Sequence, residues 1–372
     1  MYPTPLSLAA LRSLPLRCSA FAALAVAATS ALNGDPSSCT AIPDDRARLA
    51  CYDAALARPG PGAPPPVASA PATAVPPAAA GPPAAAAPSG GAPPTGSAVP
   101  DGRSLIGERW SRYDPAPGHP FLVRLHNPNY VVLRQSDRVN ASPASPGQGA
   151  VDTNRDVDRG ELKFQVSFKA RLWESGDHSY AAWLGYTQQS NWQVLNGAQS
   201  RPFRESDYQP ELMFVVQPDM PLGGGLRWQL LNLGLVHQSN GRSDPASRSW
   251  NRAYAQFGVE HDHIAGGKLA ILVRPWLRLH EPADKDDNPD ITDFLGHGDL
   301  TVLWKHGEQT LTFTGRINAH TGKGAAQVEW SMPAIPPFRF YVQAFTGYGE
   351  SLIDYNFRQT VIGAGFALND LL

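Results

Sequence analysis

The stretch ELKFQVSFKARL, residues Glu161 to Leu172, decides the fold of this chain. Its even-numbered positions are all apolar, and its odd-numbered positions are all polar. Successive side chains of a β-strand point to opposite faces of a sheet. The alternation therefore predicts a strand with one wholly apolar face and one wholly polar face.

The same alternation recurs along the rest of the chain and predicts twelve strands. They are expected near residues 125–134, 162–172, 178–188, 208–217, 226–238, 251–262, 267–280, 297–305, 309–318, 324–332, 338–348 and 356–367. Strands of about ten residues in an even number are typical of outer-membrane barrels, where closure pairs every backbone group within lipid. The expected fold is all-β, a twelve-stranded antiparallel transmembrane β-barrel. A soluble barrel or sandwich with its polar face outward is the alternative.

Loop lengths support the barrel. Short connections such as WESGD, MPLGGG, HGEQ and MPAIPP alternate with long ones at 135–160, 189–207, 239–250 and 281–296. Short periplasmic turns and longer outer loops produce this alternation. The long connections include DKDDNPD, Asp284 to Asp290, which is expected to be a solvated outer loop, whereas HDH at 261–263 is expected in a periplasmic turn.

The region before the barrel has three predicted parts. Residues 1–31 carry arginines followed by an alanine-rich apolar run, the layout of a cleaved signal peptide. Residues 32–58 contain a short predicted helix, DDRARLACYDAAL, and two cysteines, Cys39 and Cys51, for which a disulfide is favoured over a metal site in an oxidising compartment. Residues 59–105 are almost entirely small residues and proline, which predicts a disordered linker in the periplasm. The barrel domain is expected over 106–372.

Charge and hydropathy exclude two other classes of protein. The formal net charge is -2, which gives no indication of a nucleic-acid partner. After the signal peptide, no segment approaches the roughly 18 to 20 unbroken apolar residues that a membrane-spanning helix needs.

The stretch LNLGLVHQSNGR, Leu231 to Arg242, suggests chemistry on the outer face of the barrel. His237 and Ser239 have the same strand parity as three preceding leucines, so they are expected to face lipid at the extracellular end of their strand. The next strand returns with Asn251 at the head of its own apolar face, and neighbouring strands lie about 4.8 Å apart. A serine nucleophile, a histidine base and an orienting asparagine can therefore converge.

The loop SNGRSDPASRSW, residues 239–250, adds a candidate cofactor. Its hydroxyl and carbonyl oxygens suit a hard cation such as Ca²⁺. A cation beside the nucleophile could polarise an ester carbonyl.

The motif HQSNGRSDPASRSWNR resembles the outer membrane phospholipase A family. Further matches are YTQQSNWQ, PFRESDYQPEL and the closing LIDYNFRQTVIGAGFALNDLL, so the resemblance covers most of the chain from about Leu162 onward. It implies a twelve-stranded outer-membrane barrel that hydrolyses phospholipid and lysophospholipid acyl esters with calcium, and that is active as a homodimer.

Carried over by motif, the resemblance implies the following roles: Ser239 as nucleophile, His237 as general base and acid, Asn251 as the orienting residue, the Gly241 amide as an oxyanion donor, the Arg242 carbonyl and Ser247 as calcium ligands, Ser200 as a calcium ligand from the second subunit, and Gln188 as a residue of the dimer interface. It leaves the cysteine segment and the linker unexplained. Two alternatives are a passive pore or structural barrel, and a lipid A deacylase.

Overall fold

The computed structural model describes residues 42–44, 47–48, 51, 103–114, 121–151 and 157–372. The chain forms two compact units, residues 1–87 and 88–372. In the first unit Ala47, Arg48 and Cys51 are helical, and the Asp44 carboxylate accepts a hydrogen bond of 2.9 Å from the Ala47 amide, as a helix-capping residue does. These residues agree with the predicted short helix.

Cys51 is disulfide-bonded. Its predicted partner Cys39 lies outside the described residues, as do the predicted signal peptide at 1–31 and the predicted linker as far as residue 102. The pairing of the two cysteines, the signal peptide and the linker stay predictions.

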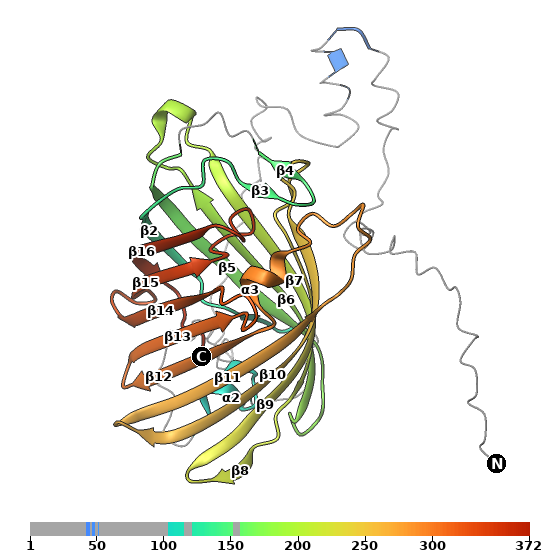
Figure 1. Ribbon diagram of the computed structural model, residues 1–372. Coiled ribbons are helices and arrows are strands. Elements are labelled where there is room, and N and C mark those ends of the chain that lie inside the picture. The colour runs from blue at the N-terminus through green and yellow to red at the C-terminus, as the bar shows by residue number, and fades with distance from the viewer. Residues whose placement is uncertain (1–41, 45–46, 49–50, 52–102, 115–120, 152–156) are drawn as a thin grey trace, which may run out of the picture. The chain divides into compact units, whose positions relative to one another are not determined.

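The second unit is a closed barrel of twelve antiparallel strands (Figure 1). The barrel strands are β2 (Tyr130–Ser136), β5 (Gly160–Glu174), β6 (Tyr180–Trp192), β7 (Phe203–Val216), β9 (Leu226–Ser239), β10 (Ser249–Ile264), β11 (Gly267–Arg278), β12 (Gly298–His306), β13 (Gln309–Ile317), β14 (Gly324–Pro333), β15 (Arg339–Tyr348) and β16 (Arg358–Ala367). Strand β2 closes the barrel because it pairs with β16 on one side and with β5 on the other. The predicted number and direction of strands are confirmed.

Short elements decorate the barrel. They are α2 (Leu105–Arg109), β1 (Val123–Leu125), β3 (Ala144–Ser145), β4 (Gly149–Ala150), the 3-10 turn η2 (Gly197–Gln199), β8 (Met220–Gly223) and α3 (Ile291–Leu295). The β3–β4 hairpin lies at one end of the barrel and β8 at the opposite end (Figure 1). Among the described residues, no helix is both long enough and apolar enough to cross a membrane.

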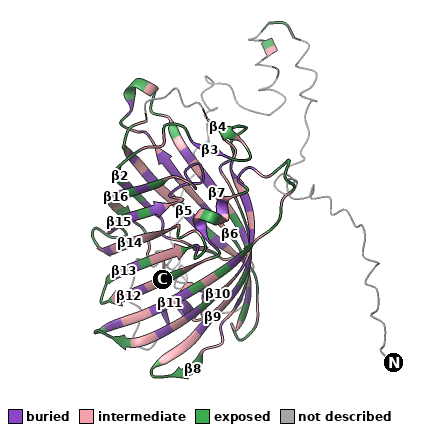
Figure 2. Ribbon diagram, viewed as in Figure 1, coloured by how far each residue is buried: buried purple, intermediate pink, exposed green. Residues whose placement is uncertain are grey.

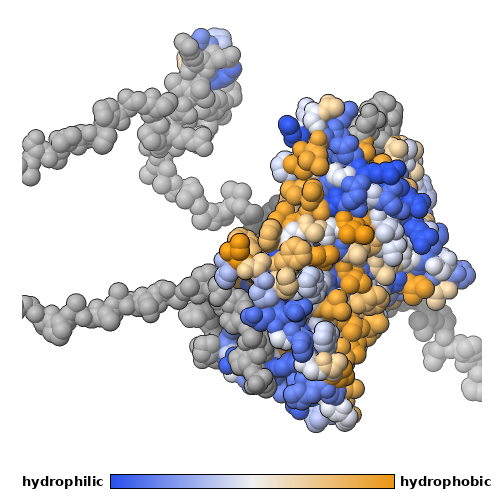
Figure 3. Space-filling model, turned by 90° about the vertical axis from the view of Figure 1, so that its left-hand side faces the viewer, coloured by the Kyte–Doolittle hydropathy of each residue, from blue (hydrophilic) through white to orange (hydrophobic). Residues whose placement is uncertain are grey.

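Burial alternates along the strands with the polar side chains inside (Figure 2). Lys169 has no exposed surface and Lys163 only 2%, whereas Leu235 is 54% exposed and Ile362 is 61% exposed. Figure 3 shows apolar side chains gathered in a band on one outer face, bordered by hydrophilic ones. This arrangement excludes the soluble alternative, because a polar outer face would leave those lysines in solvent and the apolar residues inside.

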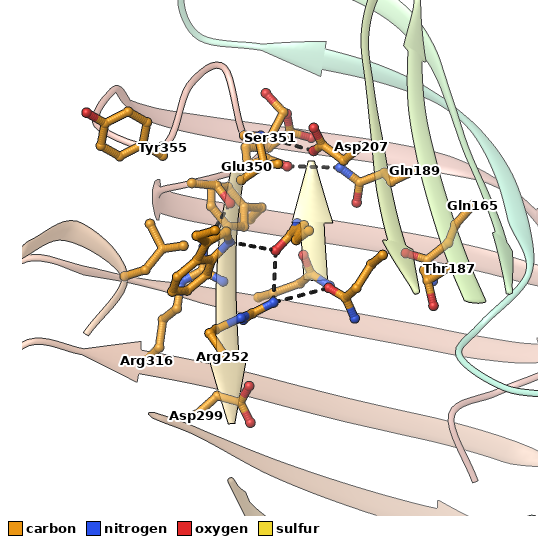
Figure 4. A pocket seen from close by; sticks show the side chains of 18 of the residues that line it. Gln165, Thr187, Gln189, Asp207, Arg252, Asp299, Arg316, Glu350, Ser351 and Tyr355 are labelled. Atoms are coloured by element: carbon orange, nitrogen blue, oxygen red, sulfur yellow. Dashed lines mark hydrogen bonds between the residues drawn. The ribbon is translucent and has the colours of Figure 1, made fainter. Parts of the chain in front are cut away.

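The polar interior is held together by ion pairs. The Glu350 carboxylate, from the loop after β15, lies 3.0 Å from Lys163 Nζ, 3.4 Å from Arg134 Nη1 and 3.6 Å from Arg204 Nη2. Figure 4 shows Glu350 with Arg252 and other residues around one interior cavity. That cavity has a volume of about 210 Å³ and a second one has about 280 Å³. The interior is therefore a polar core with small cavities, as expected if inward charges interlock.

Helix α2 fills the barrel near the β8 end. Its Ile106 amide donates to Glu260 Oε1 at 2.5 Å, and the Trp110 ring after the helix packs 3.5 Å from Lys169 Nζ as a cation–π pair. Lys169 also donates to the Arg109 carbonyl at 2.8 Å. Leu105 and Ile106 of the helix are both fully buried.

The first predicted strand, 125–134, is wrong in detail. Its first residue is the last of β1 and its residues from Tyr130 onward belong to β2, so the chain between the two is not a strand. Pro128 cannot donate a backbone hydrogen bond to a neighbouring strand. The Asn129 side chain substitutes for the missing backbone contacts: its Oδ1 accepts from the Ser167 amide at 2.7 Å and its Nδ2 donates to the Ser167 carbonyl at 2.9 Å. An amide side chain can thus replace part of a β-ladder.

Strand β9 contains a bulge. Its pairing with β10 shifts between Gly258 and Val259, so that Gln229 and Leu230 are both buried although they are adjacent. A bulge adds one residue to a strand and reverses which parity faces inward. This explains why Arg227 and Gln229 share the parity of the outward leucines.

The prediction for HDH at 261–263 was wrong. These residues belong to the last part of β10, and the turn that follows contains Ala265 and Gly266. The His261 ring nitrogen Nε2 lies 3.1 Å from the Gly224 carbonyl oxygen of the neighbouring turn.

Replacing the central carboxylate should destabilise the barrel. Glu350→Gln removes the carboxylate that pairs with buried Lys163, whereas Arg134 and Arg204 keep Glu161, so we expect the free energy of unfolding to fall by about 3 kcal/mol. Tryptophan fluorescence during denaturant unfolding in lipid vesicles would measure it. The control is Glu308→Gln, at an exposed carboxylate in the β12–β13 turn, where a change within about 0.5 kcal/mol is expected. Equal unfolding midpoints for the two variants would contradict the proposed role of Glu350.

Candidate active site

Strands β9 and β10 bring the predicted catalytic residues together. In their antiparallel register His237 lies directly opposite Asn251, and Ser239 lies opposite Ser249. The His237 side chain is exposed on the outer face at the end of β9, and Ser239 is half-buried. The register therefore aligns the end of β9 with the start of β10 at these positions.

The contact between histidine and asparagine is direct. His237 Nδ1 and Asn251 Oδ1 are 2.8 Å apart. An amide oxygen is only an acceptor, so the proton of the neutral ring must lie on Nδ1, which leaves Nε2 free to accept a proton. In the part of the chain described here, no hydrogen bond joins the Ser239 hydroxyl to the His237 ring.

The turn after Ser239 presents a backbone donor. The Gly241 amide donates to Ser239 Oγ at 3.0 Å, and Gly241 has a φ of +62°. A positive φ suits glycine, because a β-carbon adds steric strain there. The amide therefore points to the region in which an oxyanion would form on a carbonyl attacked by Ser239.

A carboxylate that sequence reasoning missed lies behind Asn251. Asn251 Nδ2 donates to Glu281 Oε1 at 2.6 Å. Glu281 follows the end of β11 and is half-buried. Its parity matches that of the outward leucines of β11, so the argument that selected His237 and Asn251 could have selected it too.

A buried asparagine shapes the loop between β9 and β10. Asn240 donates to Glu205 Oε1 at 2.9 Å and to the Ala246 carbonyl at 2.8 Å, and its Oδ1 accepts from the Arg248 amide at 2.9 Å. Arg242 Nε forms an ion pair of 3.1 Å with Glu205. These contacts join the start of the loop to β7 and tie its two ends together through Asn240.

The predicted solvated loop DKDDNPD is partly buried against the site, so that prediction was wrong. Asp287 Oδ2 accepts hydrogen bonds from the Ser247 hydroxyl at 2.7 Å and the Ser249 hydroxyl at 3.2 Å. Asn288 has no exposed surface, and its Oδ1 accepts from the Ser249 amide at 3.0 Å. The many charged residues of this loop suggested that it is solvated. Instead, Asp287 and Asn288 accept hydrogen bonds from the hydroxyl and amide groups at the start of β10 and just before it.

The oxygens around Ser247 fit a hard cation. The described residues contain no group of three or more His, Cys, Asp or Glu side chains able to hold a metal. The Ser247 hydroxyl and the Asp287 carboxylate do meet there, with 2.7 Å between their oxygens, and calcium prefers oxygen ligands of this kind. Ser200 is exposed in a left-handed conformation directly after η2, between β6 and β7, and within the described residues no hydrogen bond joins it to Ser247.

Residues 106–368 match the family described as phospholipase A1. This chain belongs to the phospholipase A1 family. A relative from Neisseria meningitidis serogroup B, provisionally named phospholipase A1, is 44% identical over 259 residues, covering 67% of this chain and 66% of the relative. The match thus spans just under two thirds of that protein's length. Phospholipase A1 of Klebsiella pneumoniae is 39% identical over 257 residues, covering 68% of this chain and 84% of the relative.

Solved structures of the family share the fold. Outer membrane phospholipase A from Escherichia coli has a TM-score of 0.63 and 33% identity, covering 72% of this chain and 100% of that one. The Salmonella typhi outer membrane phospholipase, solved as a dimer with bound calcium, has a TM-score of 0.62 and 34% identity, covering 72% and 98%. The predicted family, the barrel, the outer-membrane location and the assignment as a carboxylic ester hydrolase are confirmed.

Adding a methyl group at Gly241 should impair ester hydrolysis. The new β-carbon would meet the Tyr208 ring at 3.2 Å in a strained backbone conformation, which moves the amide away from Ser239. Losing one oxyanion donor costs about 100-fold in kcat, so we expect a fall of that size for Gly241→Ala. Gly307→Ala, which is also at positive φ but faces open space in the β12–β13 turn, is the control. Equal rates for the two variants would show that Gly241 has no role in ester hydrolysis.

Proposed function

We propose that this protein is a calcium-dependent outer-membrane phospholipase that hydrolyses acyl esters of phospholipids and lysophospholipids in the outer leaflet, and that it acts as a homodimer. The observation that carries the proposal is the 2.8 Å contact between His237 and Asn251, two residues from Ser239 on the lipid-facing surface. Unpaired polar groups facing lipid are costly, so such a contact at this depth favours a function.

In the proposed reaction Ser239 Oγ attacks the ester carbonyl and its proton moves to His237 Nε2. The oxyanion that forms accepts a hydrogen bond from the Gly241 amide. His237 then protonates the departing alcohol, a lysophospholipid or its deacylated product, and the acyl group remains on Ser239. Water attacks this ester with His237 as base, which releases the fatty acid.

Asn251 holds His237 in the tautomer that this sequence requires. Its oxygen accepts from Nδ1, so that Nε2 faces the nucleophile. The structure of the Escherichia coli protein has also been solved for an active-site mutant in which an asparagine is replaced by alanine. That substitution supports a catalytic contribution from an asparagine in this family.

Calcium would be held by the Arg242 carbonyl and the Ser247 hydroxyl, with Ser200 of the partner subunit completing the site. When bound, it would supply positive charge beside the carbonyl under attack. The Asp287 carboxylate, 2.7 Å from the Ser247 hydroxyl, adds the negative charge that such a cation requires. The calcium bound in the Salmonella typhi dimer supports this assignment.

Dimer formation is supported by the position of Gln188 on β6. Its strand parity is that of Leu184, which is 50% exposed on the outer face. Gln188 Nε2 donates to Ser190 Oγ at 3.2 Å and its Oε1 accepts from the Tyr186 hydroxyl at 3.2 Å, which leaves a second amide proton and a second oxygen lone pair to be satisfied at a surface that faces lipid. A second copy of the chain presenting the same surface would offer them partners.

The nucleophile is tested by fatty-acid release from mixed phospholipid and detergent micelles. Ser239→Ala should lower the rate by at least about 10⁴-fold with the fold unchanged, because no other group forms the acyl intermediate. The control is Ser243→Ala, at an exposed serine of the same loop, which should keep its activity. Release of acyl chains from lipid A, but not from phospholipid, would favour the lipid A deacylase instead.

Calcium is tested by chelation and by titration. Removing calcium should abolish activity and shift the protein from dimer to monomer in analytical ultracentrifugation. Ser247→Ala should raise the calcium concentration for half-maximal activity about tenfold, because one ligand and its link to Asp287 are lost. Full activity of the wild-type protein in excess chelator would refute the calcium requirement.

A further inference from the structure

Three neighbouring strands end with polar groups on the outer face. Ser239 and His237 belong to β9, Asn251 lies two residues after the start of β10, and Glu281 follows β11. Strand β11 carries Leu277, which is 72% exposed, and Glu281 continues its parity beyond the strand. The Leu279 amide donates to the Asn251 carbonyl at 2.8 Å, which continues the pairing with β10 up to Glu281.

The Glu281 carboxylate controls which way the Asn251 amide points. An ionised carboxylate only accepts hydrogen bonds, so the amide must turn its NH₂ group to Glu281, at 2.6 Å, and its oxygen to His237. Without this partner, the two ends of the amide could exchange, and an NH₂ group would face Nδ1. That arrangement would favour a proton on Nε2, the atom that must accept one.

We propose that Glu281 is a positioning residue that orients Asn251 and supplies, through it, the negative charge that a neutral asparagine lacks. The inference rests on the proposed function of Ser239, His237 and Asn251. The site then contains the order serine, histidine, asparagine, carboxylate, in which the carboxylate acts one residue further from the ring than it does in a Ser-His-Asp site.

The surroundings leave the Glu281 charge largely available to Asn251. Arg278, the cation that acts on Glu281, pairs with Asp286 at 2.6 Å, and Asp287 contacts the Ser247 and Ser249 hydroxyls. Glu281 Oε2 is buried with no hydrogen-bond partner among the described protein groups. A buried oxygen without a hydrogen bond costs stability, and such a cost is typical of residues retained for a function.

Burial is the main influence on the pKa of Glu281 and raises it, with Asp286 and Asp287 acting in the same direction. The Asn251 hydrogen bond and Arg278 lower the same pKa. The carboxylate is therefore present above this raised pKa and is lost as the pH falls through it. Acidification would therefore remove the ionised acceptor from Asn251.

Charge and orientation are separated by two substitutions. In Glu281→Gln the new amide oxygen can still accept from Asn251 Nδ2, so only the charge is lost. We expect kcat to fall about 10-fold with KM unchanged, and the acid limb of kcat/KM to move to lower pH by a few tenths of a unit, because the imidazolium is less stabilised. Glu281→Ala also loses the orientation, and kcat should fall about 100-fold.

A swap of the two side chains gives the sharpest test. Asn251→Asp alone places two carboxylates at the 2.6 Å contact, which forces them to share a proton and should cost activity. Adding Glu281→Gln lets the new glutamine amide donate to the new aspartate, which in turn accepts from His237. The double variant should therefore exceed Asn251→Asp by at least about 10-fold, a rescue that simple packing would not produce.

Asp284→Asn, at an exposed carboxylate of the same loop, is the matched control and should leave kcat and the pH profile unchanged. Denaturant midpoints should be similar for Glu281→Gln and wild type. If Ser239 is essential but Glu281→Gln changes neither kcat nor the pH profile, or the swap gives no rescue, Glu281 has no positioning role. If Ser239→Ala keeps its activity, the proposed function itself fails, so the two failures are distinct.

Discussion

The satisfaction of backbone hydrogen bonds within lipid is the constraint on which the rest of this structure depends. No water is available in the hydrocarbon to pair with a free strand edge, so the twelve strands must close, and β2 closes them by pairing with β16 and β5. Closure gives every strand an inner and an outer face. Alternation in the sequence then decides which side chains face lipid and which face the interior.

The interior face of the barrel carries buried charges that are stabilised by ion pairs with one another. Glu350 serves three cations from different strands, and Lys169 lies between the Trp110 ring and the Arg109 carbonyl. Such a core is stable only while its pairs are complete, because an unpartnered buried charge is costly. Together with α2, it leaves cavities of a few hundred Å³, which is consistent with a barrel that acts as a scaffold for chemistry on its outside.

The proposed catalytic groups lie on the outer face, at the ends of the strands. His237 and Asn251 are placed opposite each other by the β9–β10 register, and Glu281 is placed behind Asn251 by the end of β11. Loops hold the remaining parts: Asn240 and Glu205 fix one side of the catalytic loop, and Asp287 and Asn288 fix the other. Rigid strands thus position the reacting groups, while buried polar side chains shape the turn that follows Ser239.

The sequence by itself determined the number of strands, their inside-out polarity and the sharing of one face by His237, Ser239 and Asn251, because strand parity is a local, two-residue property. It did not determine the break at Pro128, the bulge in β9, or the burial of Asp287 and Asn288, because each depends on a partner distant in the chain. Glu281 lies between these cases. Its parity was readable, but only the tertiary structure decided that it reaches Asn251, since the contact requires β10 and β11 to be aligned at their ends.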